Sequence, residues 1–394
     1  MKVKELSKKS SPRIDNKFVQ ALNIQTYGED NLYPQAFRDI VHASPSGNEC
    51  IDRLADFIEG YGFKDELFSE YVINRRGDTM DEVHCRMCQD MAMFNGISLH
   101  VNYNVFGEIV ELNHVQFENC RLTEPEENGV ISKIAIHPDW TGKKTRNGKA
   151  IQVKKDNIDY IDVFNPIKEV VLAQIEHAGG IENYKGQVLW ITLFGNYEYP
   201  VGKGDKVATE MSTDEGLSNV KYRNVRCNFM PSTIMLSKKA NSVTQTGLDG
   251  SESIDYDNDE VMNSLTKIQG DKNLGKIVEI TVEADEEKPE FVNMDSKNYD
   301  KEFEVTDSSV TERIYSAFGQ EPWYCIRKGK IGFSGDILSD AFEYYNSIVS
   351  RQQRFIERVI TRIFKYWFEP VNLSNDYSIT PLRYVQNGSS DKNE

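Results

Sequence analysis

The chain has 394 residues, of which 39% are hydrophobic and 11% aromatic, so it can bury a sizeable core and its length corresponds to two or three domains. No stretch approaches the roughly 18 consecutive apolar residues of a membrane-spanning helix, so no such helix is expected. The formal net charge is −16, whereas sequence-specific DNA-binding proteins usually carry a basic surface.

Residues 1–27 are expected to form a flexible arm. The arm begins MKVKELSKKSSPRIDNK, which is basic and polar and lacks the apolar stretch of a signal peptide. We therefore expect the chain to be located in the cytoplasm, at least while it is being synthesised.

Three amphipathic helices are predicted in the first hundred residues. Two lie within 28–63, where the sequence SPSG at 44–47 separates them and Gly60 ends the second. The third covers 79–94, and Thr79 is a suitable residue to cap its N-terminus.

From residue 97 the period of the hydrophobic pattern changes to two, which indicates β-strands. Residues 97–115 alternate like a β-hairpin with a turn at 104–107. Further strands are predicted at 117–122, 130–137, 151–164 and 187–195, and one helix at 167–177. Together these elements predict an α+β domain over residues 28–202.

The middle of the chain is less regular. A helix of low intrinsic propensity is predicted at 203–228, and the Ser-, Gly- and Asp-rich stretch 240–260 is predicted to be a solvated, mobile acidic insertion. Its DYDND sequence lacks the Gly and Glu that a calcium loop requires at its sixth and twelfth positions, so we predict no calcium site. A helix at 260–269 and strands at 276–284 and 289–294 would complete a small α+β unit over 229–294.

Six cysteines are too few and too scattered for a disulfide scaffold. His84, Cys85 and Cys88 resemble part of a zinc site, but a structural site needs a fourth thiolate or imidazole nearby, and no second CxxC or HxxxH motif exists. We predict buried structural thiols on the helix 79–94 and no metal ligand.

The region 295–369 is interpreted as two helices joined by a basic segment. The helix at 295–318 has only a sparse apolar stripe, so it needs neighbouring helices or further copies of itself. The helix at 336–369 has a broad apolar stripe, and the roughly 32 residues from Asp336 to Trp367 span roughly 48 Å at the usual rise per residue. Between them, 319–335 is predicted to be free of helix, and a connection that long usually has a function.

Five segments of the chain, in order, resemble those of the portal proteins of siphovirus-like tailed bacteriophages. They are NLYPQAFRDIVHASPSGNECIDRLADFIEGYGF (31–63), CNFMPSTIML (227–236), GDKNLGKIVEI (270–280), SSVTERIYSAFGQEPWY (308–324) and FSGDILSDAFEYYNSIVSRQQRFIERVITRIFKYWF (333–368). Each segment alone is degenerate, so the specificity of the resemblance rests on their order.

The resemblance implies a portal-like α+β subunit. Its parts would be an α+β wing (28–202), a first stem helix (203–228), a small α+β clip (229–294), a second stem helix (295–318), a tunnel loop (319–335), a long wing helix (336–369) and a short tail or minimal crown (370–394). Such subunits usually form a ring of twelve at one capsid vertex, through which double-stranded DNA enters and leaves. The implied partners are the major capsid protein, the terminase large subunit and the head–tail connector. The implied location is the virion after assembly in the host cytoplasm, without a membrane, a cofactor or an enzymatic activity.

The tunnel loop is the candidate site. Gln320, Arg327, Lys328 and Lys330 are predicted to face the DNA, with Gly319, Gly329, Gly332 and Gly335 as hinges. Because each tight phosphate contact would slow the passage of DNA, an acidic ring with a few weak basic contacts suits a conduit. The alternative is that these cations pair with acidic residues of a neighbouring subunit.

Two other functions stay open at this stage. The abundant acidic residues could form a metal-dependent nuclease, although no HExxH, GxSxG or P-loop motif is present. The chain could also be a different structural ring or scaffold protein of a virion. The glycines of 329–335 do not form a nucleotide-binding loop, because they follow no predicted strand.

Overall fold

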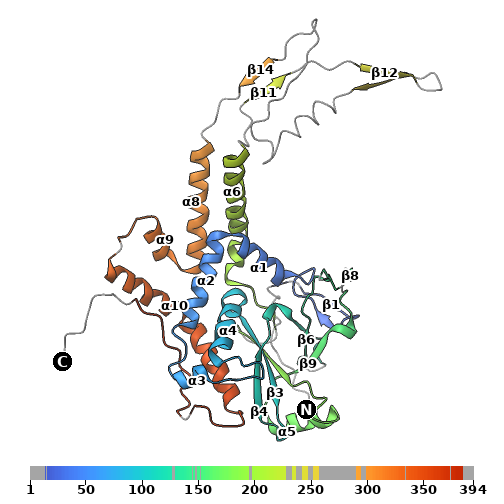
Figure 1. Cartoon of the computed structure of the whole chain (residues 1–394), viewed down its shortest axis with the longest axis vertical. Coiled ribbons are helices and arrows are strands. Elements are labelled where there is room, and N and C mark those ends of the chain that lie inside the picture. The colour runs from blue at the N-terminus through green and yellow to red at the C-terminus, as the bar shows by residue number, and fades with distance from the viewer. Residues whose placement is uncertain are drawn as a thin grey trace. The chain divides into compact units, whose positions relative to one another are not determined.

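The computed structural model describes residues 14, 16–126, 129–143, 145–146, 149–150, 152–194, 198–227, 233–236, 242–246, 252–256, 290–293, 299–332, 334–372 and 374–384. The chain divides into two compact units, of which unit 1 is Met1–Ser212 with Val310–Glu394 and unit 2 is Thr213–Ser309. The secondary structure is mixed α+β, as predicted (Figure 1).

Unit 1 begins with a short hairpin and four helices: β1 (Phe18–Val19), β2 (Ile24–Gln25), α1 (Tyr33–Ala43), α2 (Pro45–Glu59), α3 (Glu66–Glu70) and α4 (Met80–Phe94). Only Ser44 separates α1 from α2, because its side chain accepts a hydrogen bond from Gly47 N–H and so starts the second helix at once. Thr79 caps α4 in a capping box with Glu82, which confirms the predicted start of this helix.

A six-stranded sheet forms the centre of unit 1, in the order β4-β3-β10-β9-β6-β5. The strands are β3 (Gly96–Tyr103), β4 (Ile109–His114), β5 (Cys120–Leu122), β6 (Lys133–Ile136), β9 (Asp159–Val163) and β10 (Gln187–Thr192). All neighbours are antiparallel except β9 and β10. The hairpin predicted at 97–115 is confirmed, and α5 (Lys168–His177) confirms the helix predicted at 167–177.

Two predicted strands are shorter than expected. The 117–122 segment begins with a 3₁₀ turn, η1 (Phe117–Asn119), and 151–164 contains a second one, η2 (Lys155–Asn157), before β9. A further two-stranded hairpin, β7 (Thr145–Arg146) with β8 (Lys149–Ala150), lies in the polar stretch between β6 and β9. Local turns therefore interrupt these predicted strands, and the alternation of apolar and polar residues alone does not predict where the turns lie.

Two helices of equal length carry the chain across the boundary between the units. After a 3₁₀ turn, η3 (Lys203–Val207), α6 runs over Ala208–Cys227, and α8 runs over Tyr299–Phe318. These are the helices predicted at 203–228 and 295–318. They lie side by side and antiparallel, because Glu210 pairs with Arg313 (3.4 Å) and Lys221 pairs with Asp307 (2.9 Å) (Figure 1).

The described part between α6 and α8 consists of two hairpin-like pairs of strands. β11 (Thr233–Leu236) pairs with β14 (Glu290–Asn293), and β12 (Ser242–Thr246) pairs with β13 (Glu252–Tyr256). β14 confirms the strand predicted at 289–294. The stretch 240–260, predicted to be a solvated, mobile acidic insertion, contains β12 and β13, whose β-branched residues suit strands, and its solvation and mobility stay predictions. The predicted helix at 260–269 and strand at 276–284 lie outside the described residues.

After α8 the chain forms α9 (Glu321–Arg327) and α10 (Gly335–Phe364). The prediction of a helix-free segment at 319–335 is therefore wrong, because Pro322 starts a short helix that buries Tyr324 and Ile326. α10 ends before the predicted 369, because Ile109 exchanges backbone hydrogen bonds with Tyr366 and Phe368 and so holds this stretch extended beside β4.

The core of unit 1 lies between the sheet, α2, α4 and α10. Gln353 on α10 donates a hydrogen bond to Phe57 O on α2 at 2.9 Å, and the apolar face of α10 buries Tyr345, Val349 and Ile356 completely. Residues 374–384 add Tyr377 and Ile379 to this core. Within the described part of the chain, no helix has the length and apolar composition needed to cross a membrane.

Candidate functional site

The predicted tunnel loop starts at a sharp turn that ends α8. Gly319 has a φ of +71°, the left-handed conformation that favours glycine, and its N–H donates to Ser316 O at 3.0 Å. Ile348 on α10 lies against this turn: a Cβ on Gly319 would be 3.1 Å from Ile348 Cδ1. The positive φ and the close approach of Ile348 together favour glycine at this turn.

Gln320 follows this turn and is completely buried. Its Nε2 donates to Cys50 O at 2.8 Å and to Tyr345 Oη at 2.7 Å. Its Oε1 accepts a hydrogen bond of 2.8 Å from Arg53 Nη1. One amide thus connects α2, α10 and the end of α8, so the prediction that Gln320 faces DNA is corrected: the side chain is an internal link.

Arg327, at the end of α9, is held by the same helices. Its Nη1 is 3.1 Å from Glu49 Oε2 and 3.1 Å from Tyr315 Oη. Burial would raise the pKa of Glu49, but hydrogen bonds from Arg53 and Tyr315 and the charges of Arg53 and Arg327 hold it below its ordinary value. Arg327 therefore pairs with an acidic residue of its own chain, Glu49, while the predicted alternative, pairing with acidic residues of a neighbouring subunit, stays a prediction.

Aromatic and cationic contacts complete the network. The guanidinium of Arg53 lies over the ring of Trp323 at 5.5 Å from its centroid, and Lys203 Nζ donates to Phe318 O at 3.0 Å. Burial lowers the pKa of Lys203. We call Glu49, Arg53, Tyr315, Gln320, Arg327 and Tyr345 the anchor network, because they fix the start of the 319–335 segment to α2 and α10.

Lys328 and Lys330 lie beyond the anchor network and are exposed. Lys330 Nζ is 5.1 Å from the centroid of the Tyr324 ring, a cation–π contact that leaves the charge accessible. Gly329, between them, has a φ of +67°. These two lysines have the exposure that a contact with phosphate requires, and their DNA-facing role stays a prediction.

The other predicted hinges differ from one another. Gly335 is the first residue of α10 and is not among the described residues with positive φ, and the same holds for Gly332. The backbone φ at these two positions does not require glycine, whereas Gly319 and Gly329 have the positive φ that favours glycine. Whether any of the four moves is still a prediction.

Sequence reasoning missed four members of the anchor network: Glu49, Arg53, Tyr315 and Tyr345. The one available signal was the spacing of Glu49 and Arg53, which stand four residues apart on α2 and pair at 2.6 Å. Nothing in the sequence indicates that Gln320, far along the chain, lies against Arg53.

The residues considered for zinc lie on α4. His84 and Cys88 are buried, with Cys88 Sγ 3.3 Å from His84 Nε2, while Cys85 is half-buried. Nδ1 of His84 is buried and has no hydrogen-bond partner among the described residues, and burial lowers the pKa of this imidazole to about 4. The searched, described residues contain no group of three or more His, Cys, Asp or Glu side chains that could hold a metal ion.

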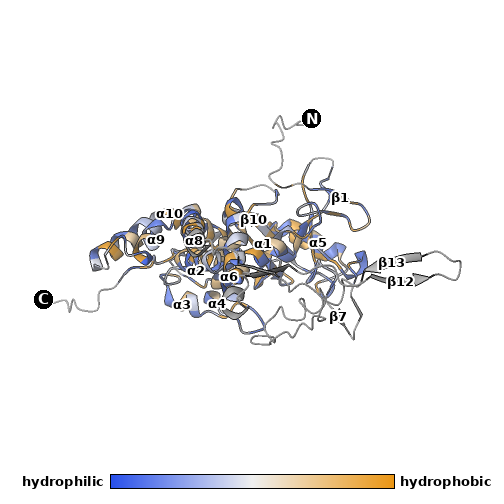
Figure 2. Cartoon of the chain, turned by 90° about the horizontal axis from the view of Figure 1, so that it is seen from above, coloured by the Kyte–Doolittle hydropathy of each residue, from blue (hydrophilic) through white to orange (hydrophobic). Residues whose placement is uncertain are grey.

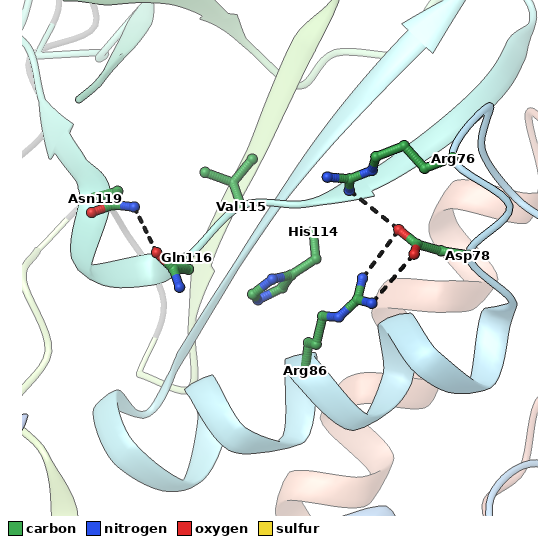
Figure 3. Close-up of a pocket in the computed structure, with 7 residues that line it drawn as sticks. All are labelled: Arg76, Asp78, Arg86, His114, Val115, Gln116 and Asn119. Carbon is green, nitrogen blue, oxygen red and sulfur yellow. Dashed lines mark hydrogen bonds and ion pairs between the residues drawn. The ribbon is translucent and has the colours of Figure 1, made fainter. Parts of the chain in front are cut away.

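An open pocket of about 450 Å³ lies between α4 and the end of β4 (Figure 3). Asp78 lies between two arginines: its Oδ2 is 3.2 Å from Arg76 Nη2 and 3.1 Å from Arg86 Nη1. The hydrogen bond from Arg86 lowers the pKa of Asp78 to about 2. His114 pairs with Asp90 at 2.8 Å. These charged groups are paired with one another, as structural residues usually are, and present no activated nucleophile.

No protein-family description and no curated protein sequence matches the chain. Among solved structures, a chain from the virion of a native gene transfer agent particle is 13% identical, with a TM-score of 0.47, over 88% of this chain and 83% of that one. A chain from the neck of an empty particle of this kind, computed with C6 symmetry, is 13% identical, with a TM-score of 0.45, over 88% of this chain and 83% of that one. A chain from the neck of the native particle, computed with C12 symmetry, is 13% identical, with a TM-score of 0.46, over 88% of this chain and 82% of that one. Similarity this low establishes no function for this chain.

Stability should depend on pH through His84. The unfolded chain binds a proton at its imidazole near pH 6.5, whereas the folded chain does so only near pH 4. The free energy of unfolding should therefore fall as the pH drops from 6.5 to 4, by roughly 3 kcal/mol in total. Denaturant unfolding of the wild type and of His84→Gln at several pH values measures this, and the variant should lack this part of the slope. Equal slopes in both proteins would contradict the assignment.

Gln320→Ala should destabilise unit 1, because it leaves Arg53, Cys50 O and Tyr345 Oη without their hydrogen-bond partner. The expected cost is about 1–3 kcal/mol in the free energy of unfolding. The control is Lys328→Ala, an exposed change in the same segment, for which we expect less than about 0.5 kcal/mol. Denaturant titration of the three proteins gives the values, and similar stability of both variants would show that Gln320 is not an essential link.

Proposed function

We propose that this chain is a portal protein: a subunit of a ring at one vertex of a phage-like particle, through which double-stranded DNA is packaged and ejected. The observation that carries the proposal is the helix pair α6 and α8, which brackets the inserted residues 228–298. A portal subunit is expected to have two such stem helices on either side of its clip.

The surfaces of the two helices support a ring. Val305 on α8 and Tyr222 on α6 are 70% and 56% exposed, and most other described side chains of unit 2 on these helices are polar. A pair of helices that leaves apolar residues in water and has few of its own to bury is stabilised when further helices pack beside it. Copies of the same chain arranged in a ring would supply such neighbours.

The charge of the chain also fits a conduit for DNA. Each copy contributes a formal charge of −16, so a ring would repel a passing phosphate backbone at short range. Tight binding to many phosphates would act as a brake, since each contact adds affinity. The exposed pair Lys328 and Lys330 would offer a limited, salt-sensitive contact in an otherwise acidic ring.

The proposed partners follow from the role in the particle: the major capsid protein around the ring, the terminase large subunit during packaging, and a head–tail connector afterwards. A different structural ring of a virion is the second candidate, which the exposed helix pair would suit equally. A metal-dependent nuclease has no support in the described residues, which contain no candidate metal-binding group, and a nuclease assay with Mg²⁺ would test it directly.

The proposal predicts that purified protein forms closed rings. Native mass spectrometry should give one dominant homo-oligomer, and images of single particles should show a central opening wide enough for duplex DNA. Twelve subunits are expected from the resemblance to portal proteins. A protein that stays monomeric at high concentration and with capsid components present would contradict the proposal, whereas a ring without an opening would favour another virion component.

Lys328→Ala with Lys330→Ala should leave the ring intact and weaken its contact with DNA, because both lysines are exposed and lie outside the anchor network. For binding of a short duplex to assembled rings, each lost phosphate contact should reduce the slope of log affinity against log salt by about 0.9. Arg327 is left unchanged, since it also holds Glu49.

The matched control is Lys154→Ala with Lys155→Ala, two exposed lysines at the start of η2 that should not affect this slope. In particles, the Lys328 and Lys330 variant should retain less packaged DNA than the control. Equal salt slopes and equal retention would remove the DNA-facing role of the two lysines without affecting the ring itself.

A further inference from the structure

A row of cations runs along the outer face of α10. It consists of Arg351, Arg354, Arg358, Arg362 and Lys365, all exposed and spaced three or four residues apart, so that they share one side of the helix. We call it the basic stripe. Among the described residues none of the five forms an ion pair. Glu357, also on α10, is engaged elsewhere: its Oε1 accepts a hydrogen bond from Ile379 N–H at 2.9 Å.

An aromatic groove of about 510 Å³ borders the basic stripe, between α10 and β10. Arg358, Arg362 and Phe355 line it from α10, and Phe164 and Phe194 line it from the sheet side. Arg362 lies 5.1 Å from the centroid of the Phe164 ring, and Phe194 is 48% exposed. Of these rings only that of Phe194 is exposed, since Phe164 is buried, and an exposed aromatic ring beside arginines is typical of the central part of a protein interface.

The same unit carries an acidic surface at the end of α2 and the start of α4. It consists of Asp52, Asp56, Glu59, Asp81 and Glu82, and none of them forms an ion pair among the described residues. Burial, and then the nearby charges of Asp81 and Asp56, raise the pKa of Glu59. We call these five residues the acidic face.

The two surfaces lie on different sides of unit 1. Seen from above, α10 and β10 run along one side, and α4 along the other (Figure 2). A chain cannot bring these sides together within itself. Two complementary surfaces on different sides of one subunit produce a head-to-tail contact, and repetition of that contact closes a ring when the rotation between copies allows it.

We propose that the basic stripe with its aromatic groove is the docking surface for the acidic face of the neighbouring copy. This inference rests on the proposed ring and assigns the contact that holds it together. A second copy suits the stripe better than DNA does, because each copy presents both an unpaired row of cations and an unpaired group of acids. A nucleic acid would leave the acidic face without a function.

Charge reversal on each surface tests the contact. The first variant carries Arg354→Glu and Arg358→Glu, and the second carries Asp56→Lys and Glu59→Lys. Alone, each variant then presents like charges across the contact, and its affinity for further copies should fall on the order of 100-fold. Mixed in equal amounts, the variants should assemble again, because each reversed surface meets a complementary one. Native mass spectrometry should then show alternating oligomers with equal numbers of the two chains.

The control is Lys154→Glu with Lys155→Glu, which reverses two exposed cations elsewhere in unit 1 and should leave assembly unchanged. Circular dichroism and thermal unfolding establish that each variant is folded. If the variant with Arg354→Glu and Arg358→Glu does not fold, Arg354→Gln with Arg358→Gln replaces it. This milder variant should weaken assembly in a salt-dependent way.

Several results would overturn the inference. If the wild type forms rings and both charge-reversed variants do so equally, the ring is held by other surfaces, and the proposed function survives. If folded variants fail alone and in the mixture, the two surfaces do not meet each other. If the first variant assembles but loses affinity for duplex DNA, the basic stripe is a nucleic-acid surface. A wild type that stays monomeric removes both this contact and the proposed function.

Discussion

The position of the whole 319–335 segment depends on one buried amide. Gln320 has no exposed surface, and its donors and acceptor are used by Cys50 O, Tyr345 and Arg53. An amide buried with these partners satisfies three groups that would each be costly to leave unpaired. Because the partners belong to α2 and α10, this residue ties the start of the segment, just after α8, to both of these helices. The candidate site is therefore built on the helical core and is not an independent loop.

The distribution of charge follows a second constraint. Some cations close to the helical core pair with acids, such as Arg327 with Glu49 and Arg86 with Asp78. The completely buried Arg121 instead donates hydrogen bonds to the backbone oxygens of Glu118 and Cys120, since burial of a charge without partners is unfavourable. Along the basic stripe on α10 the cations stay in water and unpaired among the described residues. In an acidic chain, such a row is stabilising only when something anionic approaches it, and surface ion pairs within one chain contribute little in any case. The proposed contact between copies would use these charges for orientation and specificity.

Much of the fold could be predicted because its signals are local. The capping box at Thr79, the hairpin around residues 104–107 and the long apolar stripe of α10 all depend on residues close together in sequence. The predictions that were wrong depend instead on residues that are distant along the chain. The end of α10 is determined by Ile109, and the burial of Gln320 by Arg53, both distant along the chain. Of the candidate site, the sequence therefore indicated its location and its exposed lysines but not its anchor network or α9.

The structure divides the candidate site into two parts with different physical roles. Gln320 and Arg327 belong to the anchor network, so substitutions there change stability and assembly together with any DNA contact. Lys328 and Lys330 lie on either side of Gly329, whose left-handed backbone turns the chain just after α9 ends. A short exposed turn on a rigid base keeps its charges at a constant distance from the core while the side chains themselves remain free to adjust. In a ring, this arrangement would place the same two charges at equivalent positions in every subunit, and each individual contact with a phosphate would be weak enough to release. A DNA conduit would need both properties, because a moving duplex should contact equivalent charges at every rotation and should not be bound tightly at any of them.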